Sequence, residues 1–277
     1  MRNKPIVALI YDFDGTLSPG NMQEFGFIQA VGCTPKEFWG RSNELSDKQD
    51  ASGVLAYMKL MLDEARKAGI ELRRSDFKDF GKEIELFEGV REWFGLVNEY
   101  GRSKGVQVEH YINSSGLREI IEGSPVAHEF KNIYACTFLY DENGVAEWPG
   151  YSVDYTAKTQ FLFKISKGIT SLSDDKQVND SVADEKKRIP FSNMIYLGDG
   201  DTDVPCMKIV NMFGGHSLAV FDPANEKKKS VALKLKRQGR VKFAVPAIYT
   251  GSSKAYRIIC TIIDKIKAEC ELERLSR

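Results

Sequence analysis

The sequence predicts an α/β fold, in which a doubly wound parallel sheet carries helices on both faces. Two observations lead to this prediction. Short apolar runs of strand length alternate along the chain with stretches of helical periodicity, and two acidic motifs each directly follow such a run. Ligand sites of such sheets lie at the carboxyl ends of strands, so both motifs stand where a functional site is expected.

The predicted strands are short apolar runs rich in β-branched residues. They lie near residues 5–11, 106–112, 194–197, 217–221 and 241–245. Two further β-prone runs within residues 134–148 flank Glu142-Asn143-Gly144, which predicts a hairpin near the edge of the sheet. Residues 256–266 repeat isoleucine at helical spacing and are expected to pack on the sheet.

Residues 18–88 are predicted to form a second, helical unit. Helical patterns occupy positions 34–39, 53–68 and 75–84, with no clear strand alternation between them. The predicted hinges are Ser18-Pro19-Gly20 and Glu88-Gly89. The prediction is therefore a core of residues 1–17 and 89–277 that carries an inserted helical domain of residues 18–88.

The first acidic motif is Asp12-Phe13-Asp14-Gly15-Thr16, directly after the first predicted strand. Side chains two positions apart on an extended segment point the same way, so Asp12 and Asp14 are expected on one face. Two like charges held in a cleft are costly unless a cation or a proton separates their roles. The pair therefore indicates metal-assisted chemistry with a nucleophile and an acid/base; an ordinary turn is the alternative.

The second acidic motif is Gly198-Asp199-Gly200-Asp201-Thr202-Asp203, which follows another apolar run. Mg²⁺ prefers oxygen ligands and typically binds one or two protein carboxylates together with waters and a substrate phosphate. A structural acidic turn would explain the glycines, but it would not explain carboxylates at the ends of two separate strands. The motif therefore predicts a metal site.

Two weaker motifs lie between the acidic ones. Ser114-Ser115-Gly116 ends a predicted strand before a helical pattern and offers hydroxyl and backbone N–H groups to an anion; a serine N-cap is the alternative. Lys158 lies near a predicted helix start, where the helix dipole favours acids, so another interaction is expected to hold it. A solvated lysine is the alternative, and Lys164 and Lys167 compete for any role.

Composition restricts the class of protein. The 277 residues contain 39 basic and 39 acidic side chains, a balance that predicts neither nucleic-acid nor membrane affinity. No window has the length and apolarity of a membrane span, and the first residues lack a signal-peptide pattern. The five cysteines are scattered without metal-type spacing, so reduced thiols and a cytoplasmic location are expected.

The four motifs, in this order, resemble those of the haloacid dehalogenase superfamily: Asp-x-Asp-x-Thr, a strand-end Ser or Thr, a helix-borne Lys, and Gly-Asp-Gly-x-x-Asp. The motif-bearing core covers most of the chain, and Ala157-Lys158 is similar to the lysine motif of the phosphoserine-phosphatase-like group. The resemblance implies a Rossmann-like core. It also implies that residues 18–88 are a helical cap, whose closure excludes water and decides substrate choice.

The resemblance implies a role for each motif residue. Asp12 matches the nucleophile that becomes an aspartyl-phosphate, and Asp14 matches the general acid/base. Lys158 matches the lysine that neutralises the charge of the nucleophile and the phosphoryl group. The implied substrate-binding residues are Ser114, Ser115 and Gly116, with Ser114 as the phosphate-binding hydroxyl. The implied metal ligands are Asp12, Asp14 through its backbone carbonyl, Asp199 and Asp203, and Asp201 remains unassigned.

The sequence therefore predicts an Mg²⁺-dependent phosphatase that hydrolyses a small phosphorylated metabolite. Phosphoserine phosphatases read the substrate amine with a cap glutamate; a gap-free count puts Asn21 at that position, with Glu24 three further on, so another phosphomonoester is expected. A phosphotransferase or phosphomutase would use the same residues, and a catalytically silent metabolite-binding protein would keep the fold. These alternatives, the natural substrate and the oligomeric state stay open.

Two charged segments receive no function. Residues 171–190 are polar and aperiodic, so a solvated excursion is expected. The basic residues within 227–242 are expected on a solvated helix face, because few aromatic side chains lie among them to stack nucleic-acid bases.

Overall fold

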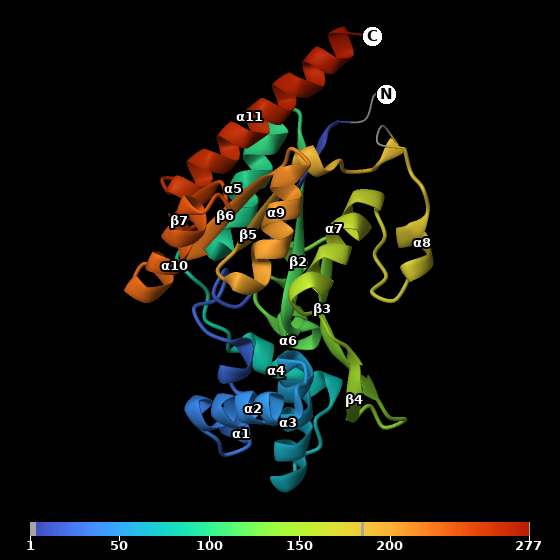
Figure 1. Cartoon of the computed structure of the whole chain (residues 1–277), viewed down its shortest axis with the longest axis vertical. Helices are drawn as coiled ribbons and strands as arrows, with labels where there is room; N and C mark the ends of the chain where they lie inside the picture. The colour runs from blue at the N-terminus through green and yellow to red at the C-terminus, as the bar shows by residue number, and fades with distance from the viewer. Residues whose placement is uncertain (1–3, 184–185, 277) are drawn as a thin grey trace.

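The computed structural model describes residues 4–183 and 186–276, and these residues contain a seven-stranded sheet (Figure 1). The spatial order of its strands is β4-β3-β2-β1-β5-β6-β7. Neighbouring strands are parallel except for the antiparallel pair β3 and β4, which confirms the predicted α/β sheet and its edge hairpin. The strands are β1 (Ile6–Tyr11), β2 (Gln107–Leu117), β3 (Asn132–Tyr140), β4 (Ala146–Tyr151), β5 (Met194–Gly198), β6 (His216–Phe221) and β7 (Phe243–Pro246).

The carboxyl ends of β1 and β5 are level with the middle of β2 in the sheet. In the parallel register, Tyr11 at the end of β1 is level with Ile112 of β2 and Leu197 of β5. Parallel strands covered on both faces read as continuous apolar runs, and β1 is buried from Val7 to Tyr11. The residues that follow these three positions therefore meet at one edge of the sheet.

Helices cover both faces of the sheet, as Figure 1 shows. α5 (Val90–Ser103) and α11 (Lys254–Leu275) pack together on one face, and α7 (Lys158–Lys167) and α9 (Val204–Met212) pack together on the other. α10 (Glu226–Arg237) follows β6 and contacts both β6 and β7. The buried isoleucines of α11 confirm that this helix packs on the core; they are Ile259, Ile262, Ile263 and Ile266.

A helical region faces the carboxyl ends of the strands (Figure 1). It contains α1 (Phe27–Ala30), α2 (Pro35–Gln49), α3 (Gly53–Lys67) and α4 (Arg74–Lys82). Thr34 and Ser52 cap α2 and α3, because each side-chain oxygen accepts a bond from a backbone N–H of the first turn. The expected run of helices between the first two motifs is confirmed.

One helix of this region is fixed directly to the core. α4 lies against α6 (Arg118–Gly123), and glycines allow the two backbones to touch. A Cβ atom on Gly123 would lie 1.9 Å from the carbonyl oxygen of Lys78, and one on Gly81 would lie 2.1 Å from that of Ile120. The helical region is therefore anchored on one side by a contact that excludes side chains.

The segment 171–190 is only partly the solvated excursion that its composition predicts. It contains the short helix α8 (Asp175–Asn179), and Asp184 and Glu185 lie outside the described residues. Arg188 forms an ion pair with the buried carboxylate of Glu109, with 2.6 Å between Nη1 and Oε2. The prediction is wrong at Arg188, because the sequence pattern does not show which buried carboxylate faces the loop.

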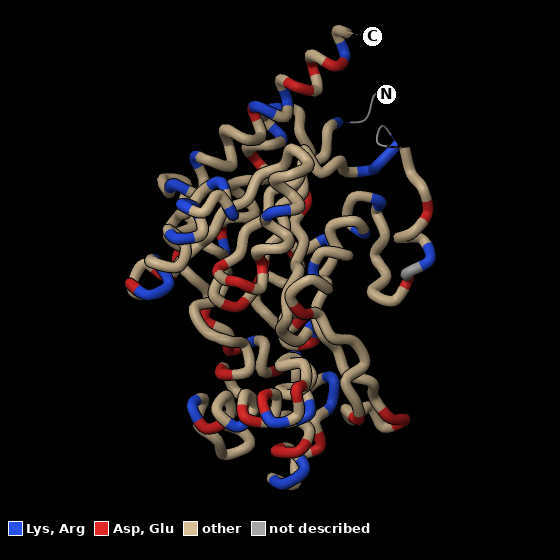
Figure 2. Tube along the Cα trace, viewed as in Figure 1, with Lys and Arg blue, Asp and Glu red and all other residues tan. Residues whose placement is uncertain are grey.

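Charge is mixed over the surface of the molecule. Basic and acidic residues both occur along α2, α3 and α11 (Figure 2). Among the described residues, no helix is long and apolar enough to cross a membrane. All five cysteines are free thiols: Cys33, Cys136, Cys206, Cys260 and Cys270.

Candidate active site

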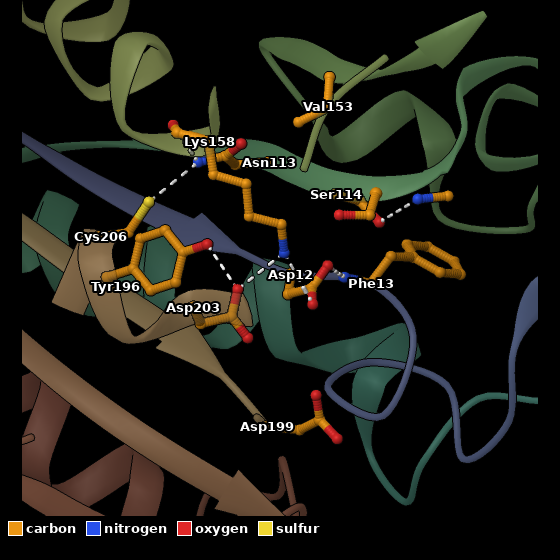
Figure 3. Close-up of polar contacts among 12 residues, drawn as sticks. Asp12, Phe13, Asn113, Ser114, Val153, Lys158, Tyr196, Asp199, Asp203 and Cys206 are labelled. Atoms are coloured by element: carbon orange, nitrogen blue, oxygen red, sulfur yellow. Dashed lines mark hydrogen bonds and ion pairs between the residues drawn. The ribbon is translucent and has the colours of Figure 1, made fainter. Parts of the chain in front are cut away.

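Lys158 stands at the centre of the residues that the two acidic motifs bring together. Its Nζ lies 3.0 Å from Oδ2 of Asp12 and 2.8 Å from Oδ1 of Asp203, and its side chain is fully buried (Figure 3). The solvated alternative is therefore wrong for this lysine. Lys164 and Lys167 do not compete for the position, because their ammonium groups bond backbone carbonyls of the loop that follows α7.

Two opposing effects set the charge of Lys158. Burial alone would lower the pKa of its ammonium group, but the charges of Asp12 and Asp203 outweigh burial and raise the pKa above its ordinary value. The backbone around Lys158 is also held, since Asn113 Nδ2 donates to the Lys158 carbonyl over 3.0 Å. The site thus contains a permanent positive charge in a fixed position.

Asp203 is the most enclosed carboxylate of the site. Burial is the largest cause that raises the pKa of Asp203, and the neighbouring charge of Asp12 raises it further. The hydroxyl of Tyr196 donates a hydrogen bond of 2.8 Å to Oδ1 of Asp203, whereas the buried Oδ2 has no hydrogen-bond partner among the described residues. Tyr196 was not predicted as a site residue, since a tyrosine within an apolar run carries no sequence signal of such a contact.

Asp14 connects the sheet to the helical region. Its Oδ1 accepts a hydrogen bond of 3.0 Å from the backbone N–H of Met22, at the start of the 3₁₀ turn Met22–Glu24. Burial raises the pKa of Asp14 well above its ordinary value, and the charge of Asp12 adds to the increase. Asp14 is therefore the carboxyl group of the first motif that is better suited to hold a proton.

The serine motif lies on the strand rather than at a helix start. β2 continues through Leu117, and α6 begins at Arg118 without a side-chain cap, so the alternative of a serine N-cap is wrong. Ser114 Oγ accepts a 3.1 Å bond from the N–H of Gly116, and the Ser115 carbonyl accepts a 2.7 Å bond from Tyr57 of α3. The motif closes the site on the side opposite Asp203 (Figure 3).

A cavity of about 880 Å³ opens above these residues. Its floor comes from the core and includes Asp12, Asp14, Ser114 and Asp199. Its walls come mainly from the helical region, where polar and aromatic side chains line it: Asn21, Glu24, Trp39, Ser42, Asn43 and Tyr57. Residues of the two acidic motifs and of the serine motif thus meet at the bottom of one pocket, and the buried Lys158 contacts Asp12 there.

The carboxylates of this pocket fit a magnesium ion. Asp12, Asp199 and Asp203 each offer an oxygen, and these three oxygens lie within 4.8 Å of one another. Hard oxygen ligands are what Mg²⁺ prefers, and the unpartnered Oδ2 of Asp203 adds a free acceptor to the cluster. Asp14, whose backbone carbonyl was predicted to bind the metal, contributes no carboxylate to it.

A second lysine reaches the site, and the sequence did not predict it. Lys228 lies on the first turn of α10, and its Nζ is 2.6 Å from Oδ2 of Asp199. It belongs to the basic run that was expected to be wholly solvated, and that expectation is wrong at this position. The contact depends on the direction in which α10 leaves β6, which residue spacing does not show.

Comparison with known proteins identifies the family. The family model of haloacid dehalogenase-like hydrolases matches residues 9–208, which include all four motifs. The chain therefore belongs to the haloacid dehalogenase-like hydrolases. An uncharacterized protein of Borreliella burgdorferi is 31% identical over 282 residues, covering 92% of this chain and 95% of its own length.

Within that family, the fold is similar to that of phosphoserine phosphatases. A substrate-bound phosphoserine phosphatase complex matches 86% of this chain and 99% of its own, with a TM-score of 0.52 at 13% identity. A probable phosphoserine phosphatase from Vibrio cholerae matches 96% of this chain and 67% of its own, with a TM-score of 0.55 at 12% identity. At these identities the similarity establishes the shared fold.

Proposed function

We propose that this protein is an Mg²⁺-dependent phosphatase that hydrolyses a small phosphomonoester through an aspartyl-phosphate on Asp12. The observation that supports it best is the position of Asp12 at the end of the central strand. There its carboxylate lies 3.0 Å from the buried ammonium group of Lys158 and within the oxygen cluster suited to Mg²⁺. A transferring phosphoryl group spreads negative charge over its oxygens, so this arrangement of cations suits it.

The proposed reaction uses the two carboxyl groups of the first motif in turn. Asp12 attacks phosphorus, the bond from phosphorus to the leaving oxygen breaks, and Asp14 gives its proton to that oxygen. Asp14 then takes a proton from water, and the resulting hydroxide attacks phosphorus, which frees Asp12 and inorganic phosphate. The raised pKa of Asp14 suits the first of these proton transfers.

Asp12, Asp199 and Asp203 would hold the proposed cation, which would supply charge stabilisation of the phosphoryl oxygens. Lys158 neutralises Asp12, so that an anionic substrate approaches the carboxylate without net repulsion. Ser114 and the backbone at Gly116 line the same pocket as Asp12 and are proposed to bind the phosphoryl group. Residues 18–88 are proposed to act as the cap that excludes water during transfer.

The pocket walls favour a substrate other than phosphoserine. Lys228 is the single lysine or arginine among the described residues that line the pocket, and it belongs to the core. The helical region thus presents no cationic side chain to bind a substrate carboxylate. Glu24 also lies on this wall, where a carboxylate could bind a substrate amine; it accepts bonds from Trp39 Nε1 over 2.8 Å and Asn21 Nδ2 over 2.7 Å. Small phosphomonoesters without a carboxylate fit this wall better.

The test is phosphate release from a panel of small phosphomonoesters, with Mg²⁺ and with a chelator. We expect release to require Mg²⁺ and to fall by about 10³-fold or more in Asp12→Asn, because the amide cannot serve as the nucleophile. Asp201→Asn is the matched control, since Asp201 belongs to the same acidic motif but is exposed and outside the pocket floor. Its activity should stay within about twofold of the wild type.

A different result would redirect the assignment. If the folded protein bound Mg²⁺ but released phosphate from no ester of the panel, the result would count against hydrolysis of a small phosphomonoester. Transfer of the phosphoryl group to another acceptor, or a binding role, would then explain the site.

A further inference from the structure

Lys228 is a half-exposed lysine at the rim of the pocket, and the proposed reaction leaves it without a role. The relative solvent exposure of its side chain is 49%, and its Nζ lies 2.6 Å from Oδ2 of Asp199. The first turn of α10 is held in place, because the side chain of Asn225 accepts bonds from the N–H groups of Lys227 and Lys228. The backbone is therefore fixed while the long side chain remains free to turn.

The two lysines that contact the carboxylates of the site differ in how firmly they are held. Lys158 is fully buried between two carboxylates, so moving its ammonium group would leave buried charges unpaired. Lys228 has one carboxylate partner and partial access to water, so its ammonium group can leave that partner and still be solvated. Lys158 is thus a fixed charge, whereas Lys228 can exchange one anionic partner for another.

The partner of Lys228 is also a residue of the oxygen cluster. Asp199 is one of the three carboxylates that fit Mg²⁺, and its carboxylate lies against Gly15, where a Cβ would come within 2.3 Å of Oδ2. A carboxylate enclosed in this way has little room to accommodate two cations independently. A divalent cation on Asp199 therefore competes with the ammonium group of Lys228 for the same negative charge.

We propose that Lys228 couples metal binding to phosphate binding by exchanging partners. It pairs with Asp199 in the protein without metal, and it turns to the phosphoryl oxygens of the substrate once Mg²⁺ holds Asp199. This inference rests on the proposed function, because it uses the same pocket. Lys228 lines that pocket together with Asp12 and Ser114, and its ammonium group already contacts Asp199, which belongs to the same oxygen cluster as Asp12.

The exchange predicts effects of opposite sign when the charge is removed. In Lys228→Met, Mg²⁺ alone should bind about fivefold more tightly, because the competing ammonium group is gone. Inorganic phosphate should bind the Mg²⁺-loaded protein about tenfold more weakly, because one charged donor is lost. A residue that only contributed to folding would not produce this pair of opposite shifts.

The experiment measures two dissociation constants by calorimetry on the full chain. Mg²⁺ is titrated alone, and inorganic phosphate is then titrated at saturating Mg²⁺ and again with a chelator. Lys228→Arg should keep both constants within about twofold, since it retains the charge. Lys229→Met is the matched control, because it changes net charge equally on the same turn while Lys229 pairs with Glu226 at the surface.

Each result decides the proposal. Opposite shifts in Lys228→Met, absent in Lys229→Met, would support it if phosphate binding with the chelator were unchanged, because Lys228 is then still paired with Asp199. An equal weakening of phosphate binding with the chelator would show only a loss of local positive charge and would overturn the exchange. Unchanged constants would show that the contact with Asp199 is incidental, and weaker Mg²⁺ binding would show that Lys228 only orients Asp199; both results would overturn it. If the wild type bound no Mg²⁺ at all, the proposed function would fail and this inference would fail with it, a result distinct from the others.

Discussion

At the scale of single residues, the site depends on a buried lysine that holds two carboxylates together. Lys158, Asp12 and Asp203 are all buried, so none of the three charges is well solvated. Removing one charged side chain of such a group leaves the other charges buried without a partner. The resulting loss of folding free energy exceeds any stability that the intact group provides relative to apolar residues of similar size. Stability and chemistry therefore depend on the same side chain.

Lys158→Met should be both inactive and less stable. We expect phosphatase activity to fall by about 10²-fold or more, because the charge beside the nucleophile is lost. The free energy of unfolding without metal should fall by about 3–5 kcal/mol, because the carboxylates of Asp12 and Asp203 remain buried and unpaired. Added Mg²⁺ should restore part of that loss.

Urea unfolding with Mg²⁺ and with a chelator measures the effect of Lys158→Met. Lys59→Met is the control, because Lys59 is an exposed lysine paired with Asp63 on α3. A Lys158→Met variant as stable as the wild type would contradict the buried, charged arrangement.

The residues of the site were predictable where a short motif contains them. Asp12, Asp14 and Asp199 follow apolar runs directly, so the strand assignment alone placed them at one edge of the sheet. Lys228 and Tyr196 were missed, because their contacts depend on how α10 and β5 face the pocket. Spacing along the chain shows which strand a residue follows. It does not show which side chains of other elements that residue will contact in the folded protein.

At the scale of secondary structure elements, the contact between α4 and α6 fixes the helical region to the core. Gly81 and Gly123 allow backbone to lie against backbone. Arg74 of α4 adds an ion pair with the fully buried Glu119 of α6, with 3.2 Å between Nη1 and Oε1. The hinge positions expected near residues 18–20 and 88–89 therefore do not isolate α4 from the sheet.

Gly123→Ala should destabilise the protein through this contact. The added methyl group would lie 1.9 Å from the carbonyl oxygen of Lys78, so the two helices must separate, at a cost of about 2 kcal/mol or more. Gly95→Ala, within α5, is the matched control: nothing lies within 4 Å of its Cβ position, and it should stabilise by about 0.5–1 kcal/mol. Chemical denaturation of both variants tests this, and equal effects would contradict the tight contact.

The elements themselves were predictable to different degrees. The central strands were clear because buried parallel strands leave continuous apolar runs. β2 is longer than expected, since Asn113, Ser114 and Ser115 are polar residues on a buried strand. The glycine contact between α4 and α6 was not predicted, because a glycine within a helical pattern does not show which neighbour approaches it.

At the scale of the whole molecule, a buried neutral histidine joins the sheet to α5. His110 of β2 lies with Nδ1 3.0 Å from the hydroxyl of Tyr11 and Nε2 3.1 Å from Oδ1 of Asn98. Trp93 of α5 donates to the same tyrosine hydroxyl over 2.9 Å. Burial lowers the pKa of His110 to about 3, so the ring stays neutral throughout the usual pH range.

This histidine makes the stability of the protein fall in mild acid. The unfolded chain takes up a proton on His110 below pH of about 6.5, whereas the native state takes it up only near the lowered pKa, so acid favours unfolding between these values. From pH 7.5 to pH 5, His110 alone should remove about 2 kcal/mol from the free energy of unfolding.

Urea unfolding at pH 7.5 and pH 5 tests this prediction. His110→Gln should show a loss on acidification that is smaller by about this amount, because its side chain does not titrate. An equal loss in both proteins would contradict a neutral, buried ring.

The division of the pocket between a core floor and a helical wall separates two kinds of variation. The floor residues belong to strand ends whose geometry the whole sheet sets, so replacing them changes the reaction itself. Wall positions such as Trp39, Ser42 and Asn43 lie on α2, away from that sheet. We therefore expect directed variation confined to those wall positions to change which ester the proposed phosphatase accepts while its chemistry stays intact.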